Sequence, residues 1–374
     1  MTVGVLREPS FETRVALLPE HITILQKWKC DVIVEYDCGV QAFANNEAYT
    51  KSGALVLSRV EVLQKADVLL CIHPITHQDL SGFAGKVLIG QFQPLYHKDL
   101  VQHWADANKI MFSLDMLPRT TRAQSMDVLS SQANIAGYKA VILAAEKFPR
   151  YFPMFMTAAG TIPPAKVLIL GAGVAGLQAI ATARRLGAVV EVFDTRPAVK
   201  EEVMSLGGKF IEVEGAADAS KAGGYAVEQS PEFIKRQKEK IAESVAKADI
   251  VITTAQIPGK KAPILIDDAM LGAMKAGSII VDLAAATGGN TTCTKNNETA
   301  HINGVCIIGN SMLPSTMPFD ASKLYGKNLL NFLQLFIKDG ILNIDMNDDL
   351  VKGSCITENG CVVHPALIKK SEAI

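Results

Sequence analysis

The sequence predicts an α/β protein built from two doubly wound parallel-sheet domains, the second of them a Rossmann dinucleotide-binding fold. Its 374 residues are enough for about two domains. Short apolar runs alternate with amphipathic stretches along most of the chain, as they do in βαβ units. A glycine-rich turn follows one of the apolar runs in the second half of the chain. Apolar residues make up 49% and charged residues 20%, which is typical of a globular protein with a large core.

The first third of the chain predicts one sheet. We expect strands at Val3–Leu6, Asp31–Glu35, Val68–Ile72, Val87–Gln91 and Ile110–Leu114. The helices expected between them are Glu20–Trp28, Val60–Gln64 and Lys98–Ala107. Strands that alternate with helices in this way predict a mostly parallel sheet.

A second series of strands begins after Lys166 and predicts the second sheet. Its expected strands are Val167–Leu170, Val189–Phe193, Lys209–Val213, Asp249–Thr253, Ser278–Asp282 and Val305–Ile308. A long helix, Ala123–Phe148, is expected between the two series, and another, Asp320–Phe336, returns the chain after the second. We therefore expect a discontinuous flavodoxin-like α/β domain made of residues 1–126 and 315–374, and a Rossmann domain made of residues 127–314.

Charge and composition exclude several classes of function. Lys plus Arg number 37 and Asp plus Glu 38, so the net charge of −1 gives no field that would attract a nucleic acid. The seven cysteines form no Cys-x-x-Cys pair, and the histidines have no metal-ligand spacing, so we expect reduced thiols and no metal. The longest uncharged apolar run, Val167–Ala183, contains three glycines and is short for a membrane span. We expect a buried strand, turn and helix there, and no direct insertion into a membrane.

The strongest motif is Gly-x-Gly-x-x-Gly at residues 171–176, between an apolar strand and the expected helix Leu177–Leu186. Gly171 permits the tight turn, Gly173 lets the backbone approach a pyrophosphate, and Gly176 lets helix and strand pack closely. The backbone at Val174 and Ala175 opens the helix, whose amides and dipole stabilise phosphate charge. The sequence therefore predicts a nicotinamide dinucleotide site.

Asp194, followed by Thr195 and Arg196, ends the next expected strand at about the spacing at which a ribose-binding acid follows this motif. A carboxylate accepts hydrogen bonds from the ribose hydroxyls and repels a 2′-phosphate, which predicts NAD(H) rather than NADP(H). Arg196 instead favours NADP(H), since arginine accommodates a 2′-phosphate.

Two later turns, at residues 253–259 and 282–290, follow apolar strands. Ligands of such folds bind beyond the carboxyl ends of the strands. We expect Thr254, Ala255, Gln256 and Leu283 to line the ribose groups of the nucleotide. Ordinary turn chemistry is the alternative explanation of these residues.

Several segments resemble one known superfamily. They are Arg7-Glu8, Arg14–Pro19, Cys71–Pro74, and the second-domain unit with Asp282 and Gly288-Gly289. The chain is similar in them to the alanine dehydrogenase and transhydrogenase superfamily, over nearly its whole length. The closer resemblance is to the NAD(H)-binding components (domain I, alpha subunit) of proton-translocating NAD(P) transhydrogenases. The segments that distinguish this component within the superfamily are Pro118–Asn134, Gly223–Tyr225 and Val363–Leu367.

This resemblance implies direct hydride transfer between NADH bound here and NADP+ bound on a partner domain. A transmembrane proton-channel domain outside this chain would couple the transfer to proton translocation. The resemblance also implies a homodimer and a soluble domain at the inner face of an energy-transducing membrane, on the bacterial cytoplasmic side or the mitochondrial matrix side. Tyr225 resembles a loop tyrosine that folds over bound nucleotide, although it is also consistent with an exposed aromatic residue of a mobile surface loop, Gly215–Ser230.

The resemblance implies that Arg119, Gln124, Asp127 and Ser130 contact the nicotinamide and its ribose, and that Gln124 also faces the incoming NADP(H). Read by themselves, Gln124, Asp127 and Ser130 have spacings that place them on one helical face. This set supplies the donors and acceptors that a carboxamide needs. A helix start that caps itself is the alternative.

The chain also departs from alanine dehydrogenase. That family uses a lysine near Cys71–His73, a histidine near Gln93 and an aspartate at the position of Ala286, whereas Arg14 is retained. Amino-acid oxidation needs a proton-transfer group beside the reacting carbon, and neither Gln93 nor Ala286 supplies one. A soluble alanine-type dehydrogenase and a catalytically idle NAD-binding module remain as alternatives.

Overall fold

The computed structural model describes residues 1–213, 215 and 230–368, and it divides into two compact units. Unit 1 combines Met1–Gln132 with the segment that begins at Ser315, and unit 2 is Ala133–Pro314. The first division falls inside helix α6 (Val128–Lys147), somewhat later than the expected division after residue 126. No helix among the described residues combines the length and apolar character that crossing a membrane requires.

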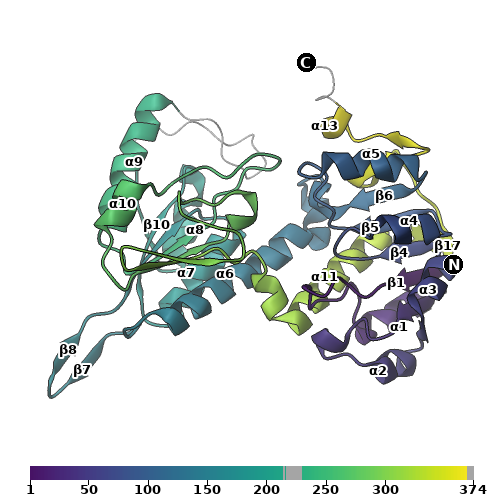
Figure 1. The fold of residues 1–374 in the computed structure, drawn as a ribbon, viewed down its shortest axis with the longest axis horizontal. Coiled ribbons are helices and arrows are strands. Elements are labelled where there is room, and N and C mark those ends of the chain that lie inside the picture. Colours follow the sequence, from purple (N-terminus) through teal and green to yellow (C-terminus); the bar gives the residue numbers. More distant parts are fainter. Residues whose placement is uncertain (214, 216–229, 369–374) are drawn as a thin grey trace. The chain divides into compact units, whose positions relative to one another are not determined.

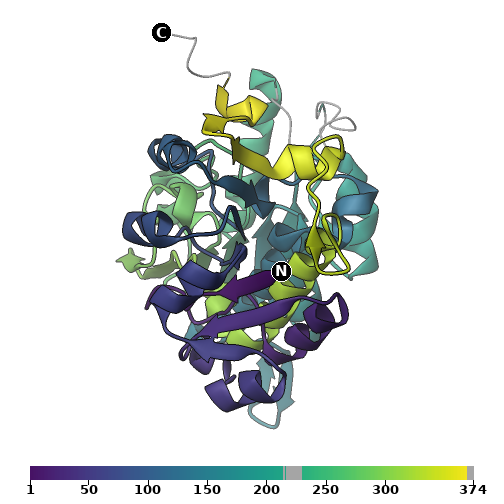
Figure 2. The same ribbon diagram turned by 90° about the vertical axis from the view of Figure 1, so that its right-hand side faces the viewer.

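The sheet of unit 1 has the order β19-β18-β6-β5-β4-β1-β2-β3. Its strands are β1 (Thr2–Val5), β2 (Asp31–Glu35), β3 (Leu55–Leu57), β4 (Val68–Leu70), β5 (Val87–Gly90), β6 (Ile110–Ser113), β18 (Cys355–Glu358) and β19 (Cys361–Val362). The strands from β1 to β6 are parallel, while β18 and β19 extend the sheet antiparallel beyond β6. Figure 2 shows this C-terminal extension in yellow, joined to the earlier strands.

This strand order corrects the expected flavodoxin-like topology of the first domain. A flavodoxin-like sheet runs 2-1-3-4-5, whereas the first six strands here run 3-2-1-4-5-6, which is the Rossmann order. The difference comes from β3, which pairs with the outer edge of β2. The run Leu-Val-Leu of β3 is apolar, but it is only three residues long and Leu55 is exposed, so the sequence analysis did not count it as a strand.

Helices cover both faces of this sheet. They are α1 (Pro19–Lys27), α2 (Asn46–Lys51), α3 (Arg59–Lys65), α4 (His77–Gly82), α5 (Lys98–Asp106), α11 (Pro318–Leu333), α12 (Asp349–Ser354) and α13 (Pro365–Ile368). One core joins the strands to α1, α11 and α12, and the other joins them to α3, α4 and α5. Helix α11 thus fixes the returning chain in the core of unit 1 (Figure 1).

The sheet of unit 2 has the order β11-β10-β9-β12-β13-β15-β14, a Rossmann arrangement. Its strands are β9 (Lys166–Leu170), β10 (Val189–Phe193), β11 (Lys209–Phe210), β12 (Ile250–Thr253), β13 (Ile279–Asp282), β14 (Thr299–Ile302) and β15 (Val305–Ile308). The expected strand Lys209–Val213 is only two residues long, and the antiparallel edge strand β14 was not expected. A hairpin of β7 (Phe155–Thr157) and β8 (Gly160–Ile162), also not expected, projects from the unit (Figure 1).

Strand periodicity explains how unit 2 is layered. Val167 and Ile169 of β9 face one core, with α6, α7 (Val174–Arg185) and α8 (Lys200–Ser205). The alternate residues, Leu168 and Leu170, face the other core, with α9 (Pro231–Val245) and α10 (Asp268–Ala273). Successive side chains of a strand point to opposite faces, so a continuous apolar run fits a sheet covered on both sides. The expected fold class is confirmed.

Candidate functional site

The glycine-rich turn joins β9 to α7, and the backbone requires a glycine at two of its three glycine positions. Gly171 has φ +108°, a conformation that L side chains rarely adopt. A Cβ on Gly176 would lie 1.9 Å from the carbonyl oxygen of Gly171, so any side chain there would force the helix away from the turn. Gly173 differs, because a Cβ there would meet nothing within 4 Å. Its side of the turn is open, as approach of a ligand to the backbone requires.

Helix α7 begins at Val174, directly after this turn. Gly173 is its N-cap, and among the described residues no side chain caps the helix. The first amides of a helix have no partners inside it and carry partial positive charge. Val174 is exposed and Ala175 is half-buried, so the start of the helix is accessible to an anion such as a pyrophosphate.

Asp194 follows β10 and is bound to the turn. Its Oδ2 atom accepts a hydrogen bond of 2.7 Å from the amide of Ala172. The Arg196 side chain donates to both oxygens, from Nε to Oδ1 at 2.9 Å and from Nη2 to Oδ2 at 2.7 Å. This hydrogen bonding to Asp194 raises the pKa of Arg196. Asp194, the predicted ribose acceptor, thus lies beside the glycine-rich turn, and Arg196 binds both of its carboxylate oxygens.

The later turns also converge at the carboxyl ends of their strands. Thr254 donates from Oγ1 to the carbonyl oxygen of Gly171 at 3.1 Å, which fixes the turn after β12 against the glycine-rich turn. The Gln256 side chain donates to the carbonyl oxygen of Leu283 at 2.7 Å. Thr254, Ala255 and Leu283 are half-buried, and Gln256 is exposed.

A buried pair that the sequence analysis missed holds these turns. Asn290 donates from Nδ2 to the carbonyl oxygen of Ala255 at 2.9 Å and accepts from the Ala255 amide at 3.1 Å. The backbone amide of Asn290 donates to Oδ2 of Asp282 at 2.6 Å, and neither side chain is exposed. The signal was present, since both polar residues flank the glycine-rich turn that follows the apolar strand β13. Buried polar groups of this kind are fully paired and therefore specify one backbone arrangement.

The Arg119–Ser130 segment lies in unit 1 and differs from its expected form. Instead of one helix from Ala123 to Phe148, a 3-10 helix, η3 (Thr121–Met126), precedes α6. Asp127 breaks the helix because its backbone is extended and its side chain caps α6, accepting from the Ser130 amide at 2.9 Å. The prediction that Gln124, Asp127 and Ser130 share one helical face is therefore wrong. Arg119 and Gln124 are exposed, whereas Asp127 and Ser130 are half-buried and bonded to each other.

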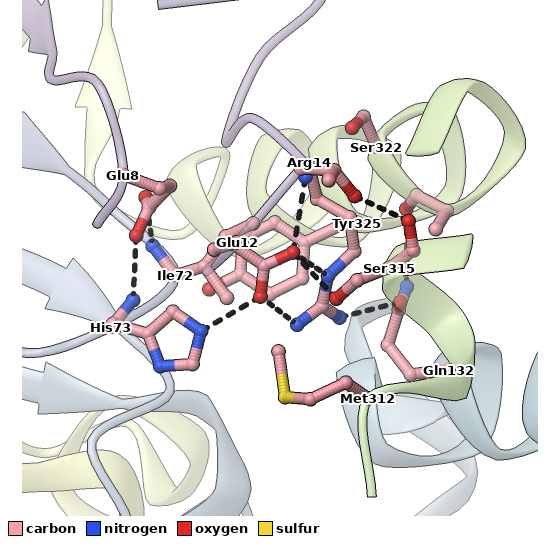
Figure 3. Close-up of polar contacts among 12 residues, drawn as sticks. Glu8, Glu12, Arg14, Ile72, His73, Gln132, Met312, Ser315, Ser322 and Tyr325 are labelled. Carbon is pink, nitrogen blue, oxygen red and sulfur yellow. Dashed lines mark hydrogen bonds and ion pairs between the residues drawn. The ribbon is translucent and has the colours of Figure 1, made fainter. Parts of the chain in front are cut away.

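A second polar cluster that the sequence analysis missed lies in the core of unit 1 and centres on Glu12 (Figure 3). Glu12 accepts from Arg14 Nε at 2.8 Å and Nη2 at 2.6 Å, and from Ser315 Oγ at 2.7 Å. His73 Nε2 lies 2.7 Å from the same carboxylate, and Arg14 Nη1 donates to Gln132 at 2.8 Å. Burial by itself would raise the pKa of Glu12, but these hydrogen bonds outweigh it and hold the pKa well below its usual range.

Glu8 lies beside this cluster in a different environment. Its carboxylate accepts from the amides of Ile72 at 2.7 Å and His73 at 3.0 Å, which ties the N-terminal loop to the end of β4. Burial raises the pKa of Glu8 to about 7, against the lowering effect of His73 and of the two amides. Both clusters are satisfied within unit 1, and they organise the loop that contains Arg14.

Of the other predicted residues, Thr195 follows Asp194 and is half-buried, and Tyr225 lies outside the described residues. The described part of the chain has no group of three His, Cys, Asp or Glu side chains suited to a metal ion. The Rossmann sheet and the open amide-lined turn with its carboxylate are the features of a dinucleotide-binding protein.

Comparison with known proteins identifies the family. Residues 4–136 match the N-terminal domain, and residues 140–365 the C-terminal domain, of alanine dehydrogenase/PNT. The chain belongs to the alanine dehydrogenase/PNT family.

Within this family, the chain is more similar to transhydrogenases than to alanine dehydrogenases. It is 46% identical over 367 residues to the first part of the alpha subunit of the NAD(P) transhydrogenase of Rhodospirillum rubrum, a match that covers 95% of this chain and 96% of that one. A crystal structure of transhydrogenase from Sinorhizobium meliloti matches with a TM-score of 0.86 and 42% identity, covering 98% of this chain and all of that one. An alanine dehydrogenase of Staphylococcus haemolyticus is 24% identical over 97% of this chain and 94% of its own. The resemblance to NAD(P) transhydrogenase alpha subunits that the sequence indicated is confirmed.

Proposed function

We propose that this chain is the NAD(H)-binding component of a proton-translocating NAD(P) transhydrogenase. The observation that carries the proposal is the open turn at Gly173, before the start of α7 and with Asp194 beside it. It occurs in a chain of which 95% is similar to the first part of a transhydrogenase alpha subunit. A bound nicotinamide supplies or accepts a hydride, and the residues of this chain bind, orient and exclude water. Membership of the family also supports a role in oxidation and reduction.

We propose that unit 2 binds the adenosine half and the pyrophosphate. The amides of Val174, Ala175 and Gly176 stabilise phosphate charge, and Gly171 and Gly173 let the backbone come close. Asp194 accepts from the adenosine ribose, with Thr195 and Arg196 beside it. Thr254, Ala255, Gln256 and Leu283 line the nucleotide from the neighbouring turns. Tyr225 completes this proposed set.

Replacement of Asp194 by alanine should weaken NADH binding about ten- to a hundredfold and narrow the preference for NADH over NADPH. Hydrogen bonds to a charged acceptor contribute roughly 1.5–3 kcal/mol, and removal of the carboxylate also removes its repulsion of a 2′-phosphate. Equilibrium titration with both nucleotides measures the effect. Asp194→Asn is the control for the turn, because its amide oxygen still accepts from Ala172. Unchanged NADH affinity in Asp194→Ala would assign selectivity to Arg196 and the neighbouring turn.

We propose that Arg119, Gln124, Asp127 and Ser130 of unit 1 contact the nicotinamide and its ribose, with Gln124 facing the incoming NADP(H). Direct hydride transfer between two nicotinamide rings needs position and orientation rather than a general acid or base. The absence of proton-transfer side chains at Gln93 and Ala286 agrees with this chemistry. The exposure of Arg119 and Gln124 also supports the proposal, since a buried side chain could not reach a second cofactor.

We propose that NADP(H) is bound by a partner domain and that a transmembrane domain of the same enzyme couples transfer to proton translocation. The Rhodospirillum rubrum relative is named as one part of an alpha subunit, which supports the existence of partner subunits. The chain would then work at the inner face of an energy-transducing membrane, on the bacterial cytoplasmic or mitochondrial matrix side.

We predict that the chain is a homodimer at micromolar concentration. Most oligomers of soluble chains are symmetric pairs, and the apolar fraction of 49% leaves surface for an isologous contact. Sedimentation equilibrium or light scattering should give twice the chain mass of 40.2 kDa. A mass equal to one chain would contradict the prediction.

A single-turnover assay tests the proposed function. The chain is mixed with the NADP(H)-binding component of the enzyme, NADH, and an NADP+ analogue whose reduced form absorbs at its own wavelength. Reduction of the analogue at the expense of NADH supports the proposal. If the analogue is not reduced, but NAD+ is reduced when L-alanine is added, the alternative of an alanine-type dehydrogenase is correct. Nucleotide binding without either reaction would indicate an idle NAD-binding module.

A further inference from the structure

The segment that carries Gln124 is a 3-10 helix, η3, rather than an α-helix. Its i→i+3 hydrogen bonds have poorer geometry than those of an α-helix. The Ala123 amide donates to Thr120 at 3.0 Å, and the Asp127 amide reaches the carbonyl oxygen of Gln124 only at 3.4 Å. Ala123 and Met126 are buried, which anchors one side of η3 in the core. Gln124 and Ser125 lie on the exposed side of η3, where contacts from other elements add to this anchoring.

Two asparagines of α11 bind the peptide next to Gln124. The carbonyl oxygen of Ser125 accepts hydrogen bonds of 2.8 Å from Nδ2 of both Asn328 and Asn331. These asparagines are three residues apart and lie on one face of the helix. A carbonyl oxygen has two lone pairs, and here both have a donor. The position of the Gln124–Ser125 backbone is therefore set by a helix about two hundred residues later in the chain.

Stability alone does not explain Asn328. The residue is 8% exposed, and its Oδ1 atom is buried with no hydrogen-bond partner among the described residues. A buried acceptor without a partner lowers stability, whereas a leucine of similar size would pack there without that penalty. The amide is explained by the bond that it donates to Ser125. Residues that depart from the stability optimum in this way are concentrated at functional sites.

An ion pair fixes η3 on the other side of Gln124. Arg122 binds Asp348 through both of its Nη atoms, with Nη1 to Oδ2 at 2.8 Å, and it also contacts Asp349. Asp348 caps α12 by accepting from the Leu350 amide at 2.9 Å, so its side chain is itself held in place. A bidentate arginine–carboxylate pair has defined geometry even at a partly exposed position.

We propose that Asn331 and Asn328 are positioning residues for hydride transfer: they hold the Ser125 carbonyl group, and thereby the backbone from which Gln124 projects. The inference rests on the proposed function, since it uses the role given there to Gln124. The proposal also gives the returning helix α11 a role beyond its packing in the core of unit 1. The helix supplies the two side-chain donors that bind the Ser125 carbonyl oxygen.

The test compares three variants in the single-turnover assay with the NADP(H)-binding component, NADH and the NADP+ analogue. Asn331→Ala should slow transfer about fivefold to tenfold, and Asn328→Ala combined with Asn331→Ala on the order of a hundredfold, because displacement of a reacting group by about 1 Å has an effect of that size. The NADH dissociation constant should change by less than about threefold, as expected for residues that act on the transition state alone. Gln334→Ala is the matched control, because Gln334 is an exposed amide side chain at the C-cap of the same helix.

Hydrogen exchange provides a measurement that is independent of activity. Backbone amides of residues 123–127 should exchange faster in Asn331→Ala than in Gln334→Ala, since local opening becomes easier when the donor is lost. Transfer at the wild-type rate in the double variant would overturn the proposal, as would unchanged exchange in η3. A parallel loss of NADH affinity and transfer rate would also overturn it. If the wild-type chain itself transfers no hydride, the proposed function fails instead.

Discussion

Replacing Gln124 by alanine should slow hydride transfer by on the order of a hundredfold while NADH affinity stays within a few-fold. Gln124 is exposed on the 3-10 helix of unit 1, whereas the pyrophosphate and adenosine contacts proposed here belong to unit 2. Most of the binding free energy should therefore survive the substitution. The orientation of the reacting ring should be lost, and a misplacement of about 1 Å lowers a rate by about a hundredfold. A contact made mainly in the transition state has this kinetic signature.

The experiment separates binding from transfer. NADH affinity is measured by equilibrium titration, and transfer by single turnover with the NADP(H)-binding component. Thr121→Ala, at an exposed position of the same 3-10 helix, is the control and should change neither quantity. Transfer at the wild-type rate would mean that Gln124 is only a residue at the start of a helix. If affinity and rate fell together, Gln124 would be a ground-state ligand of the nucleotide.

Replacing Glu12 by alanine should destabilise unit 1 by about 3–5 kcal/mol, the size expected when one partner of a buried ion pair is removed. Glu12 is 3% exposed and binds Arg14, His73 and Ser315. Its removal leaves the Arg14 guanidinium buried with Gln132 as its remaining hydrogen-bond partner in this cluster. The penalty is mainly that of an uncompensated buried charge, which is much larger than the value of an exposed pair.

Intrinsic fluorescence isolates this effect, because both tryptophans of the chain, Trp28 and Trp104, belong to unit 1. Urea unfolding followed by tryptophan emission should show a lower midpoint for Glu12→Ala at an unchanged slope. Glu20→Ala is the matched control: Glu20 pairs with Lys323 at 3.5 Å, both side chains are about half exposed, and the loss should be below about 1 kcal/mol. Equal midpoints for the two variants would show that the Glu12 cluster contributes no more than a surface pair.

The parts of the site that follow from local sequence could be predicted well. Gly171 needs its positive φ and Gly176 its missing side chain because of atoms within the same strand–turn–helix unit, so the motif alone identifies them. Asp194 lies one strand further along, and its position beside the turn follows from the parallel pairing of β9 with β10. These are short-range consequences of chain geometry.

Competition between local interactions explains where the prediction for α6 failed. The apolar periodicity from Ala123 onward fits a helix, but Asp127 offers its carboxylate to the Ser130 amide and starts the helix there instead. Aspartate competes with the backbone in this way at helix starts. The sequence contained both possibilities, and burial of Ala123 and Met126 beside α11 favours the broken form.

The sequence by itself determined the α/β class, the approximate positions of most strands, the glycine-rich turn and the family, because each depends on periodicity or on residues close together in the chain. Only the tertiary structure decided the order of strands in unit 1, the burial of Glu12 with Ser315, and the support of Ser125 by Asn328 and Asn331. Those contacts join residues two to three hundred positions apart. Such pairings are set by which faces of helices and sheets pack together, and the residues that form them show no local pattern that distinguishes them from other polar residues.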